Sequence, residues 1–447
     1  MAIAGQKRQG DLFPILSTCK RQAQVLDWAS LPRDNAIIIT ELLLEEDVVD
    51  YMSFRAVCAS WRASTSSPRD PTLRDARFRP RCWVALCDGD GVRPVDAGEI
   101  TFFNTSTSRC LRVRLPELQF YRIVGFTDGL VILLNKSTSV LRVIHPFTRI
   151  FLDLPPLAPI FRYFVKNTHS MAWMSAAVCL SHTSIAVVVW FPNAPGVICS
   201  EPGQRWWTVI HERLELSTAL PFQGKLFGVS KGSRNLIQVY PPSLQQCVVA
   251  QISVQFKLPD VCCFNLVEFQ GHIILAVRLP RSDDLSSDRW RPFTFALFHA
   301  NMSNGKLAQV NSLGNNHALF LGNDRCISVS VKGFPSICRD SVYISQRTPS
   351  PTILHTISTG RFEQMSRRSH ISDSSEVNKL HSIRPFTLVD QLLTYCNHAE
   401  WSRGFIFHDF HANPMPWEKY LMFSAQDKEI RLPSLSKHEV EMRHFGR

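Results

Sequence analysis

The sequence predicts an α+β chain of two units: a small N-terminal unit of three short helices, and a large all-β, propeller-like domain behind it. Residues 27–66 repeat apolar side chains at the three- and four-residue spacing of helices. From about residue 82, short apolar runs alternate with Gly-containing turns, which is typical of successive hairpins. A Gly followed by an apolar run recurs in three similar fragments, and such repetition indicates blades.

The helical unit begins at Leu31-Pro32, because proline is favoured at the first position of a helix. Asp47 offers a side-chain oxygen that can cap a second helix. Ser53 is expected to cap a third helix, whose apolar stripe would consist of Phe54, Val57, Cys58 and Trp61. About 40 residues bury too little apolar surface to be stable alone, so this unit is expected to depend on a neighbour or a partner.

The β domain is predicted from apolar runs separated by turns. The turns are Thr127–Gly129, Gln223–Lys225, Gln270–His272 and Asn304-Gly305. The spacing of the fragments GFTDGLVILL, PFQGKLFGV and EFQGHIILA predicts five to seven blades, with one degenerate blade between the first two. The predicted strands are Leu130–Leu134, Val140–Ile144, Ile185–Trp190, Leu226–Val229, Leu236–Tyr240, Ile273–Val277, Phe293–Phe298 and Cys326–Val331.

The chain is expected to divide into five segments, and a further short helix is predicted near its end, at residues 385–396. The segments are a loose leader (1–26), the helical unit (27–66), a basic connector (67–81), the β domain (82–413) and a tail (414–447).

The composition favours an intracellular protein that does not enter a membrane. Hydrophobic residues make up 45% and charged residues 19%, an ordinary globular balance. The longest apolar run, Ile185–Phe191, has seven residues, whereas a membrane span needs about 20. No apolar signal segment follows Met1–Gln9, and the 13 cysteines show no C-x-x-C spacing, so reduced thiols in the cytoplasm or nucleus are expected.

The net charge of +11 is unevenly distributed. Residues 27–66 carry −4, and residues 67–447 carry +12. This asymmetry indicates two different partners, and the basic part favours an acidic or phosphorylated protein target. No run of like charge and no known nucleic-acid motif is present, so nucleic-acid binding is not expected.

Motifs for catalysis or metal binding are weak. Gly228–Gly232 matches G-x-S-x-G, but an apolar run follows it where a nucleophile elbow needs a helix, so a hairpin turn is predicted. A zinc set could be drawn from cysteine and histidine near the C-terminus, but its spacing fits no known finger. No catalytic residue, metal or cofactor is therefore expected. The residues considered for zinc are Cys396, His398, His408 and His411.

A family resemblance covers most of residues 27–410. The segment LPRDNAIIITELLLEEDVVDYMSFRAVCASWR resembles the F-box, whose pattern runs from Leu-Pro to Val-Cys-x-x-Trp. The downstream fragments VIHPFTRIFLDLPPLAP, VVVWFP and RPFTLVDQLLTYCNHAEWSRG, with those above, are similar to plant F-box proteins that carry a KIB-type β-propeller, formerly a domain of unknown function. After Leu-Pro-x-Asp the family usually has two leucines, whereas this chain has Asn35 and Ala36.

The resemblance implies the substrate-recognition subunit of a Skp–cullin–F-box ubiquitin ligase, without catalytic activity of its own. The helices would bind the Skp adaptor, and through it the cullin, while the propeller would recruit a target protein. Two alternatives remain: a propeller scaffold whose degenerate F-box recruits no ligase, and a propeller-borne hydrolase. The implied adaptor contacts are Leu31, Pro32, Ile39, Leu42, Leu43, Val48, Val49, Val57, Cys58 and Trp61.

Overall fold

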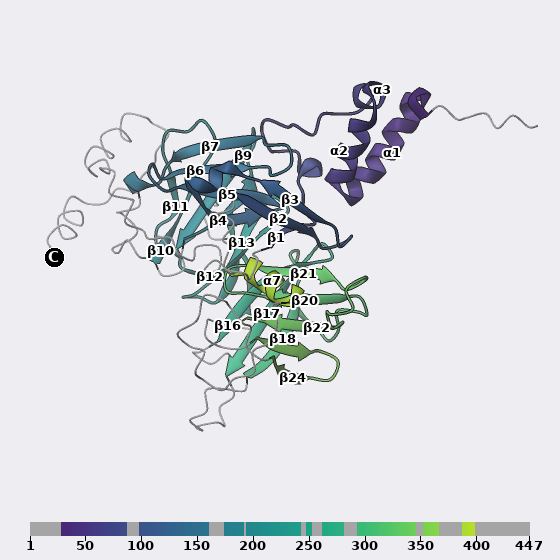
Figure 1. The fold of residues 1–447 in the computed structure, drawn as a ribbon. Coiled ribbons are helices and arrows are strands. Elements are labelled where there is room, and N and C mark those ends of the chain that lie inside the picture. The colour runs from purple at the N-terminus through teal and green to yellow at the C-terminus, as the bar shows by residue number, and fades with distance from the viewer. Residues whose placement is uncertain are drawn as a thin grey trace, which may run out of the picture.

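The strands of the computed structural model form six sheets arranged as the blades of a propeller, with the N-terminal helices beside it (Figure 1). The predicted organisation and the expected range of five to seven blades are therefore confirmed. No described helix is long and apolar enough to span a bilayer. The structure describes residues 28–86, 98–160, 174–191, 194–242, 247–252, 262–280, 293–345, 352–365 and 387–397.

The N-terminal unit consists of η1 (Trp28–Ser30), α1 (Arg33–Glu46), α2 (Val48–Val57) and α3 (Ala59–Ala63). Asp47 caps α2 as predicted, because its side chain accepts the Val49 N–H. The expected start of the third helix at Ser53 is wrong. Ser53 lies inside α2, and its hydroxyl donates to the Val49 carbonyl at 2.8 Å.

The break between α2 and α3 falls at Cys58. Its backbone is extended (φ −151°, ψ 166°), which ends α2. Its sulfur then accepts the Trp61 N–H at 3.4 Å, so Cys58 caps α3. Phe54 and Trp61 still stack, with ring centroids 4.1 Å apart, although they belong to different helices.

The first three sheets follow one another along the chain, after the short η2 (Ala76–Phe78). Sheet β1-β2-β3 has three strands: β1 (Trp83–Leu86), β2 (Glu99–Asn104) and β3 (Cys110–Arg114). After η3 (Pro116–Gln119), the next sheet contains β4 (Tyr121–Thr127), β5 (Leu130–Asn135), β6 (Val140–Ile144) and β7 (Phe151–Pro156). The third contains β8 (Ser175–Leu180), β9 (Ile185–Phe191), β10 (Ala194–Ser200) and β11 (Thr208–His211).

The last three sheets complete the ring. Two are four-stranded: β12 (Leu216–Phe222), β13 (Lys225–Ser230), β14 (Asn235–Tyr240) and β15 (Cys247–Gln251), then β16 (Cys263–Phe269), β17 (His272–Pro280), β18 (Phe293–Ala300) and β19 (Leu307–Val310). The sixth has the order β21-β20-β22-β23-β24, with β20 and β22 parallel. It contains β20 (His317–Leu321), β21 (Cys326–Ser330), β22 (Ser341–Ile344), β23 (Ile353–Thr356) and β24 (Arg361–Gln364).

All eight predicted apolar runs are strands, and the three Gly fragments occupy equivalent places in their blades. Each fragment joins the first strand of a sheet to the second: β4 to β5, β12 to β13 and β16 to β17. Each turn has two residues with positive φ, such as Gln270 (50°) and Gly271 (76°). This is the backbone of the two-residue turn that matches strand twist. One blade, β8 to β11, lies between the first two, as expected.

The apolar runs lack polar alternation because the sheets are covered on both faces. Every residue of Ile185–Phe191 is buried. Val187 and Val189 pack toward the β4–β7 sheet, whereas Val188 and Trp190 pack toward the β12–β15 sheet. Ser230 ends β13, and β14 follows at Asn235, so the G-x-S-x-G segment is the predicted hairpin and not a strand–helix elbow.

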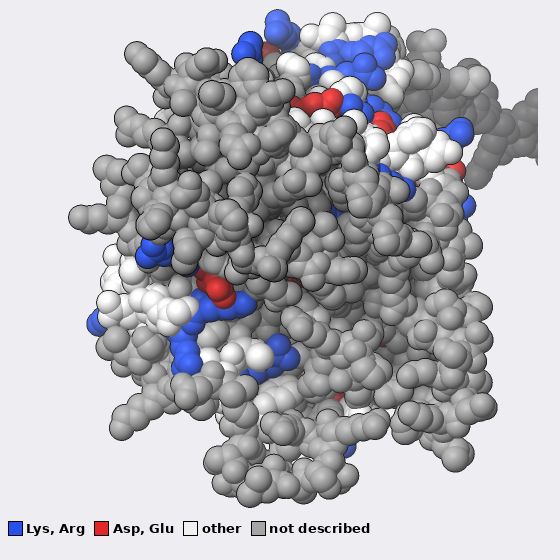
Figure 2. All heavy atoms as spheres, turned by 90° about the vertical axis from the view of Figure 1, so that its left-hand side faces the viewer, with Lys and Arg blue, Asp and Glu red and all other residues white. Residues whose placement is uncertain are grey.

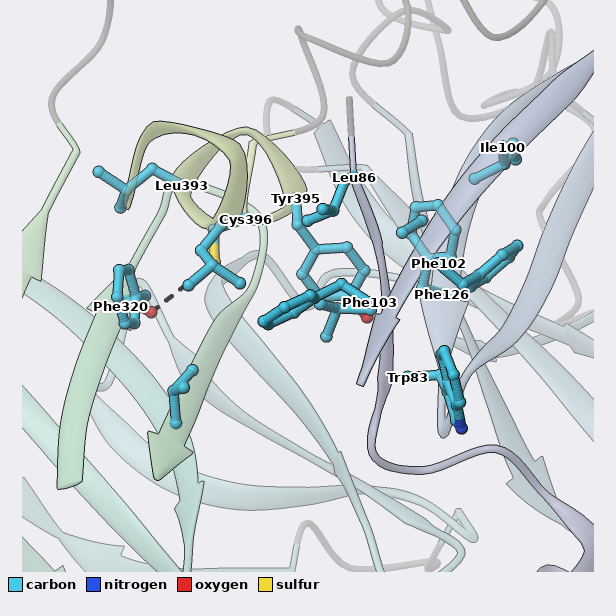
Figure 3. Close-up of a cluster of buried hydrophobic side chains, with 14 of the residues drawn as sticks. Trp83, Leu86, Ile100, Phe102, Phe103, Phe126, Phe320, Leu393, Tyr395 and Cys396 are labelled. Carbon is cyan, nitrogen blue, oxygen red and sulfur yellow. Dashed lines mark hydrogen bonds between the residues drawn. The ribbon is translucent and has the colours of Figure 1, made fainter. Parts of the chain in front are cut away.

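The predicted C-terminal helix, α7 (Leu388–Tyr395), closes the ring. A capping box between Thr387 and Asp390 starts it. It contacts β1 of the first sheet and both β20 and β22 of the last. Figure 3 shows Tyr395 between Phe103 and Phe126 on one side and Phe320 on the other. Residues 300 positions apart in sequence thus share one core.

We predict that Gly322→Ala destabilises the propeller at this closure. A Cβ added at Gly322 would lie 2.3 Å from the Cys396 carbonyl oxygen, so the end of α7 would have to move. Overpacking of this kind costs about 1–3 kcal/mol. Chemical denaturation measures the loss. Gly232→Ala is the matched control because a Cβ there meets nothing within 4 Å. Equal stability of the two variants would contradict closure by α7.

Candidate functional site

Exposed apolar side chains gather on the N-terminal helices. Among the described residues, eight large apolar side chains are strongly exposed, and four of them lie between residues 28 and 57. Such a concentration in so short a segment is typical of a surface that a partner protein covers. The four are Trp28 (62% exposed), Ile38 (57%), Leu42 (60%) and Val57 (65%).

Helix α1 has one face toward the protein and one toward solvent. Ala36 and Thr40 are 1% and 3% exposed, and the Thr40 hydroxyl donates to the Ala36 carbonyl at 2.9 Å. Ile38 and Leu42 are four residues apart, so they lie together on the opposite face. We call this pair the apolar ridge of α1. The exposed carboxylates of Glu41 and Glu45 lie along the same helix.

The ten residues predicted to contact a partner differ in exposure. Pro32, Leu42 and Val57 are exposed. Val48 is 3% exposed and packs with Tyr51 and Phe78, so in this arrangement it has no surface to offer a partner. The half-buried residues are Leu31, Ile39, Leu43, Val49, Cys58 and Trp61.

Two strongly exposed residues were absent from the predicted set. Ile38 could have been found from its i, i+4 spacing to Leu42, but periodicity alone does not tell which face of a helix is covered. Trp28 precedes the Leu-Pro pair, and its carbonyl accepts the Trp61 indole N–H at 3.0 Å. This bond fixes η1 against α3.

Asp47 joins the helices to the first blade. Its carboxylate is buried, at 4% exposure. Oδ1 accepts the Val49 N–H at 2.9 Å and the Trp83 indole N–H at 2.8 Å, while Oδ2 accepts the Asn104 amide at 3.1 Å. One side chain thus caps α2 and holds β1 and the end of β2.

Further contacts surround this anchor. Asp50 of α2 pairs with Arg109, in the turn that leads into β3. Tyr51 packs against Phe78, with ring centroids 5.7 Å apart, and its hydroxyl donates to the Ser66 carbonyl at 2.6 Å. The helices are therefore held to the propeller by both charge and apolar packing.

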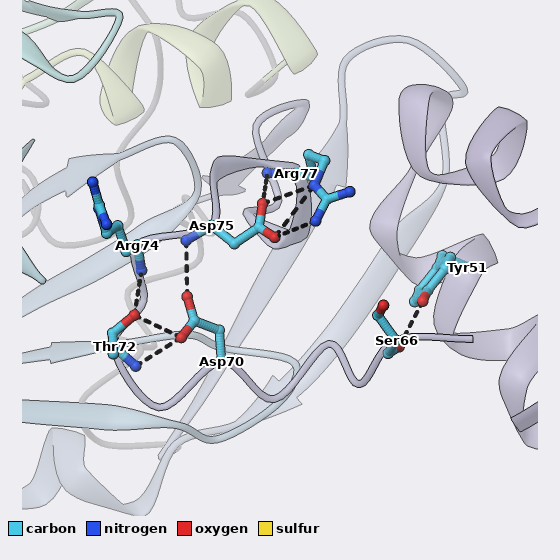
Figure 4. A network of polar contacts seen from close by, with 7 residues as sticks. All are labelled: Tyr51, Ser66, Asp70, Thr72, Arg74, Asp75 and Arg77. Carbon is cyan, nitrogen blue, oxygen red and sulfur yellow. Dashed lines mark hydrogen bonds and ion pairs between the residues drawn. The ribbon is translucent and has the colours of Figure 1, made fainter. Parts of the chain in front are cut away.

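The segment 67–81, predicted as a basic connector, is a folded strap (Figure 4). Asp70 accepts the Thr72 N–H and hydroxyl at 2.8 and 2.7 Å and the Asp75 N–H at 2.8 Å. Burial acts to raise the pKa of Asp70, but these hydrogen bonds outweigh it and lower the pKa below its usual value. Asp75 in turn pairs with Arg77 at 2.6 Å.

The strap also docks on the β4–β5 turn. Arg79 is buried and reaches Asp128 Oδ2 at 3.0 Å. A Cβ on Gly129 would lie 2.1 Å from the Pro80 carbonyl oxygen, so only glycine lets the two backbones approach. The repeated Gly turns are therefore not one free binding surface: Pro80 covers the first, and Leu180 packs on Gly224 of the second.

His145 supports the strap from below. Its Nδ1 lies 3.2 Å from the N–H groups of both Phe147 and Thr148, so Nδ1 is the acceptor. Nε2 then carries the proton and donates to the Phe78 carbonyl at 2.9 Å. Burial lowers the pKa of this histidine, against the opposing effect of the hydrogen bond to Phe78.

The arrangement suits binding more than chemistry. Burial raises the pKa of the Cys199 and Cys326 thiols to about 12, so both stay protonated. No three potential metal ligands cluster within the part of the chain that the structure describes. Cys396 is buried against Phe320, and His398, His408 and His411 lie outside the described residues.

The described charges do not form one basic face. On the side shown in Figure 2, Lys and Arg side chains appear in separate groups, with Asp and Glu beside several of them. Several arginines are also paired: Arg142 lies 2.6 Å from Asp153, and Arg149 lies 2.6 Å from Glu117. The excess positive charge is thus spread over several places on the propeller.

We predict that Asp47→Ala loosens the helices from the propeller. The change leaves the Trp83 indole and the Asn104 amide buried without their acceptor and removes the α2 cap, which together cost about 3 kcal/mol or more. Hydrogen exchange should then speed up throughout α2. Asp34→Ala, an exposed change in the first turn of α1, is the control. Unchanged exchange in α2 would contradict the anchoring role.

We also predict that acid weakens the strap. A histidine whose folded-state pKa is lowered contributes its full stability above the unfolded value of about 6.5 and loses it as the pH falls below that value. The free energy of unfolding should therefore fall between pH 7 and 5, and fall less in His145→Gln. The exposed His182→Gln variant should keep the wild-type slope, and an identical slope in His145→Gln would refute the assignment.

The fold resembles solved propellers only distantly. A protein of unknown function from Bacteroides thetaiotaomicron shares 10% identity over 67% of this chain and 72% of its own, with a TM-score of 0.28. The Cps50 (Swd1) β-propeller domain of Myceliophteria thermophila shares 9% identity over 63% of this chain and 79% of its own, also at 0.28. No curated protein matches the sequence.

A family model gives a clearer result. The model of the KIB1-4 β-propeller matches residues 102–368, from within β2 to just beyond β24. The match covers more than half of the chain and includes five of the six described sheets in full. The chain belongs to the KIB1-4 β-propeller family.

Proposed function

We propose that this chain is the substrate-recognition subunit of a Skp–cullin–F-box ubiquitin ligase. The N-terminal helices bind a Skp-type adaptor, and the propeller recruits the protein to be ubiquitinated. The chain itself performs no chemistry and works in the cytoplasm or nucleus. The observation that carries the proposal is the exposed apolar surface of the helices, which a separate, well-packed propeller holds out to solvent.

The apolar ridge of α1 is the first element of the proposed adaptor surface. Ile38 and Leu42 expose more than half of their area, and burying such side chains contributes about 1.5–3 kcal/mol each. Val57 and Trp28 add apolar area at the ends of α2 and η1. The helical unit gains from a partner what its own small core does not supply.

The rigid connection to the propeller supports the same role. A ligase subunit has to hold its target at a fixed place relative to the adaptor, so that lysines of the target meet the transferred ubiquitin. Asp47, the Asp50–Arg109 pair and the folded strap supply such a fixed geometry. A flexible tether between the two units would not.

One observation favours the alternative of a scaffold without a ligase. Ala36 stands where the family usually has leucine, and at 1% exposure it faces α2 and leaves no room for a larger side chain. Asn35 is exposed and adds a polar group beside the apolar ridge. The adaptor surface is therefore less apolar than its pattern requires, and adaptor binding decides between the two functions.

We predict that the full chain binds a purified Skp-type adaptor and that Leu42→Gln and Val57→Gln each weaken the complex roughly tenfold, which is about 1.4 kcal/mol. Both side chains are more than half exposed, so the thermal stability should not change. Phe120→Gln, a change of a 64% exposed side chain on the propeller, should leave binding intact. Titration calorimetry measures all three.

Asn35→Leu should strengthen the complex, because it restores an apolar side chain beside the ridge. Ala36→Leu should instead destabilise α1, since that position is buried. If neither the wild-type chain nor Asn35→Leu binds any Skp-type adaptor tested, the ligase function fails and the scaffold function takes its place.

A further inference from the structure

The first sheet is smaller than the others. Within the described residues, β1-β2-β3 has three strands, whereas every other sheet has four or five. Its outermost strand, β3 (Cys110–Arg114), therefore occupies the third position of a blade, and no described strand pairs with its outer side.

The hydrogen-bond pattern shows which backbone groups of β3 point outward. Leu115 N–H donates to Gly98 O at 2.7 Å, and Asn104 N–H donates to Arg109 O at 2.8 Å. In an antiparallel pair, hydrogen-bonded positions alternate, so Leu111 and Val113 bond to β2. The N–H and C=O of Arg112 and Arg114 then lie on the outer edge.

Only basic side chains accompany this edge. The sequence from Arg109 to Arg114 contains three arginines and no acid. Arg112 is 72% exposed and only 3.8 Å from Glu99, a loose pair, and Arg114 is exposed. Leu111 and Val113 pack inward against the core of the first blade, so the strand itself is firmly held.

The edge begins beside the helices. Arg109, directly before β3, pairs with Asp50 of α2, and Figure 1 shows β3 as the strand of its sheet nearest to α2. At the other end, Arg149 Nη1 reaches the Arg114 carbonyl at 3.4 Å, and Phe151, two residues further on, is 46% exposed. The edge thus has an aromatic side chain close to its far end.

From these observations we propose that β3 is a docking strand. An extended, acidic segment of a partner protein adds to its outer edge as a fourth strand. The outward N–H and C=O groups of Arg112 supply the backbone ladder, and the arginine side chains select carboxylates. This surface is separate from the apolar ridge of α1, so the proposal does not require adaptor binding. If the chain is a ligase subunit, the bound segment lies next to the helices.

A competing explanation is that the arginines only protect an exposed edge, as charges on edge strands often do. The two explanations differ in what an acidic strand does. A protective edge repels or ignores every added strand, whereas a docking strand binds an acidic one and rejects a basic one.

The test uses fluorescence anisotropy with the full chain and a labelled peptide of alternating Glu and Val. Two matched peptides are the Lys–Val version and a Glu–Val version with a central proline, which cannot continue the ladder. At about 50 mM salt, where screening is weak, we expect the Glu–Val peptide to bind at least tenfold more tightly than either.

Arg112→Pro is the diagnostic variant. It removes an outward N–H without removing a hydrogen bond to β2, so binding should fall at least tenfold while the fold is kept. Arg112→Gln keeps the N–H and should lose only the contribution of the charge, about threefold. The double reversal R112E/R114E keeps every N–H and carries the test should Arg112→Pro unfold, which circular dichroism reports. Arg361→Gln, on the outer strand β24 of another sheet, is the matched control.

Hydrogen exchange gives an independent readout. The Arg112 amide should exchange quickly in the free chain and slowly with the Glu–Val peptide bound. The proposal is overturned if this amide is already protected in the free chain, because another segment or a second copy then covers the edge. It is equally overturned if the Glu–Val peptide does not bind at millimolar concentration, or if R112E/R114E binds it as the wild type does.

Discussion

The buried carboxylate of Asp47 is the contact on which the relation between helices and propeller depends. A charge of this kind is stable away from water only when hydrogen bonds satisfy it, and here the donors come from three places: the first turn of α2, Trp83 of β1 and Asn104 at the end of β2. Because each donor is itself fixed, the carboxylate converts three local structures into one arrangement. The direction in which α1 presents its apolar ridge follows from it.

The propeller has its own constraint, the joining of its first and last blades. Ring closure brings β1 and β20 together from opposite ends of the described chain, and α7 fills the space between them. Cys396 lies so close to Gly322 that no side chain fits there. A rigid ring matters for function, because surfaces on separate blades keep their spacing only if the ring does not open.

The two candidate surfaces share one end of this rigid body. The apolar ridge lies on α1, and the outer edge of β3 starts where Arg109 meets Asp50 of α2. One surface is apolar and the other is basic, so they suit partners of different chemistry. This matches the uneven charge of the sequence, with net negative charge on the helical segment and positive charge beyond it.

The sequence by itself determined the elements and their kind. Apolar runs without polar alternation required strands covered on both faces, and the Asp128-Gly129 and Gln270-Gly271 pairs required tight hairpins, so the propeller followed from local chemistry. What local patterns could not decide was which side of an element is covered. The stripe from Phe54 to Trp61 spans two helices because Cys58 takes an extended backbone, and Val48 is buried while Ile38 is exposed because β1 and the strap lie on one side of the helices only. Likewise, the free edge of β3 exists only in the assembled sheet, since periodicity marks a strand but not its neighbours. Faces and edges are set by contacts between residues far apart in sequence, and only the tertiary structure fixes those.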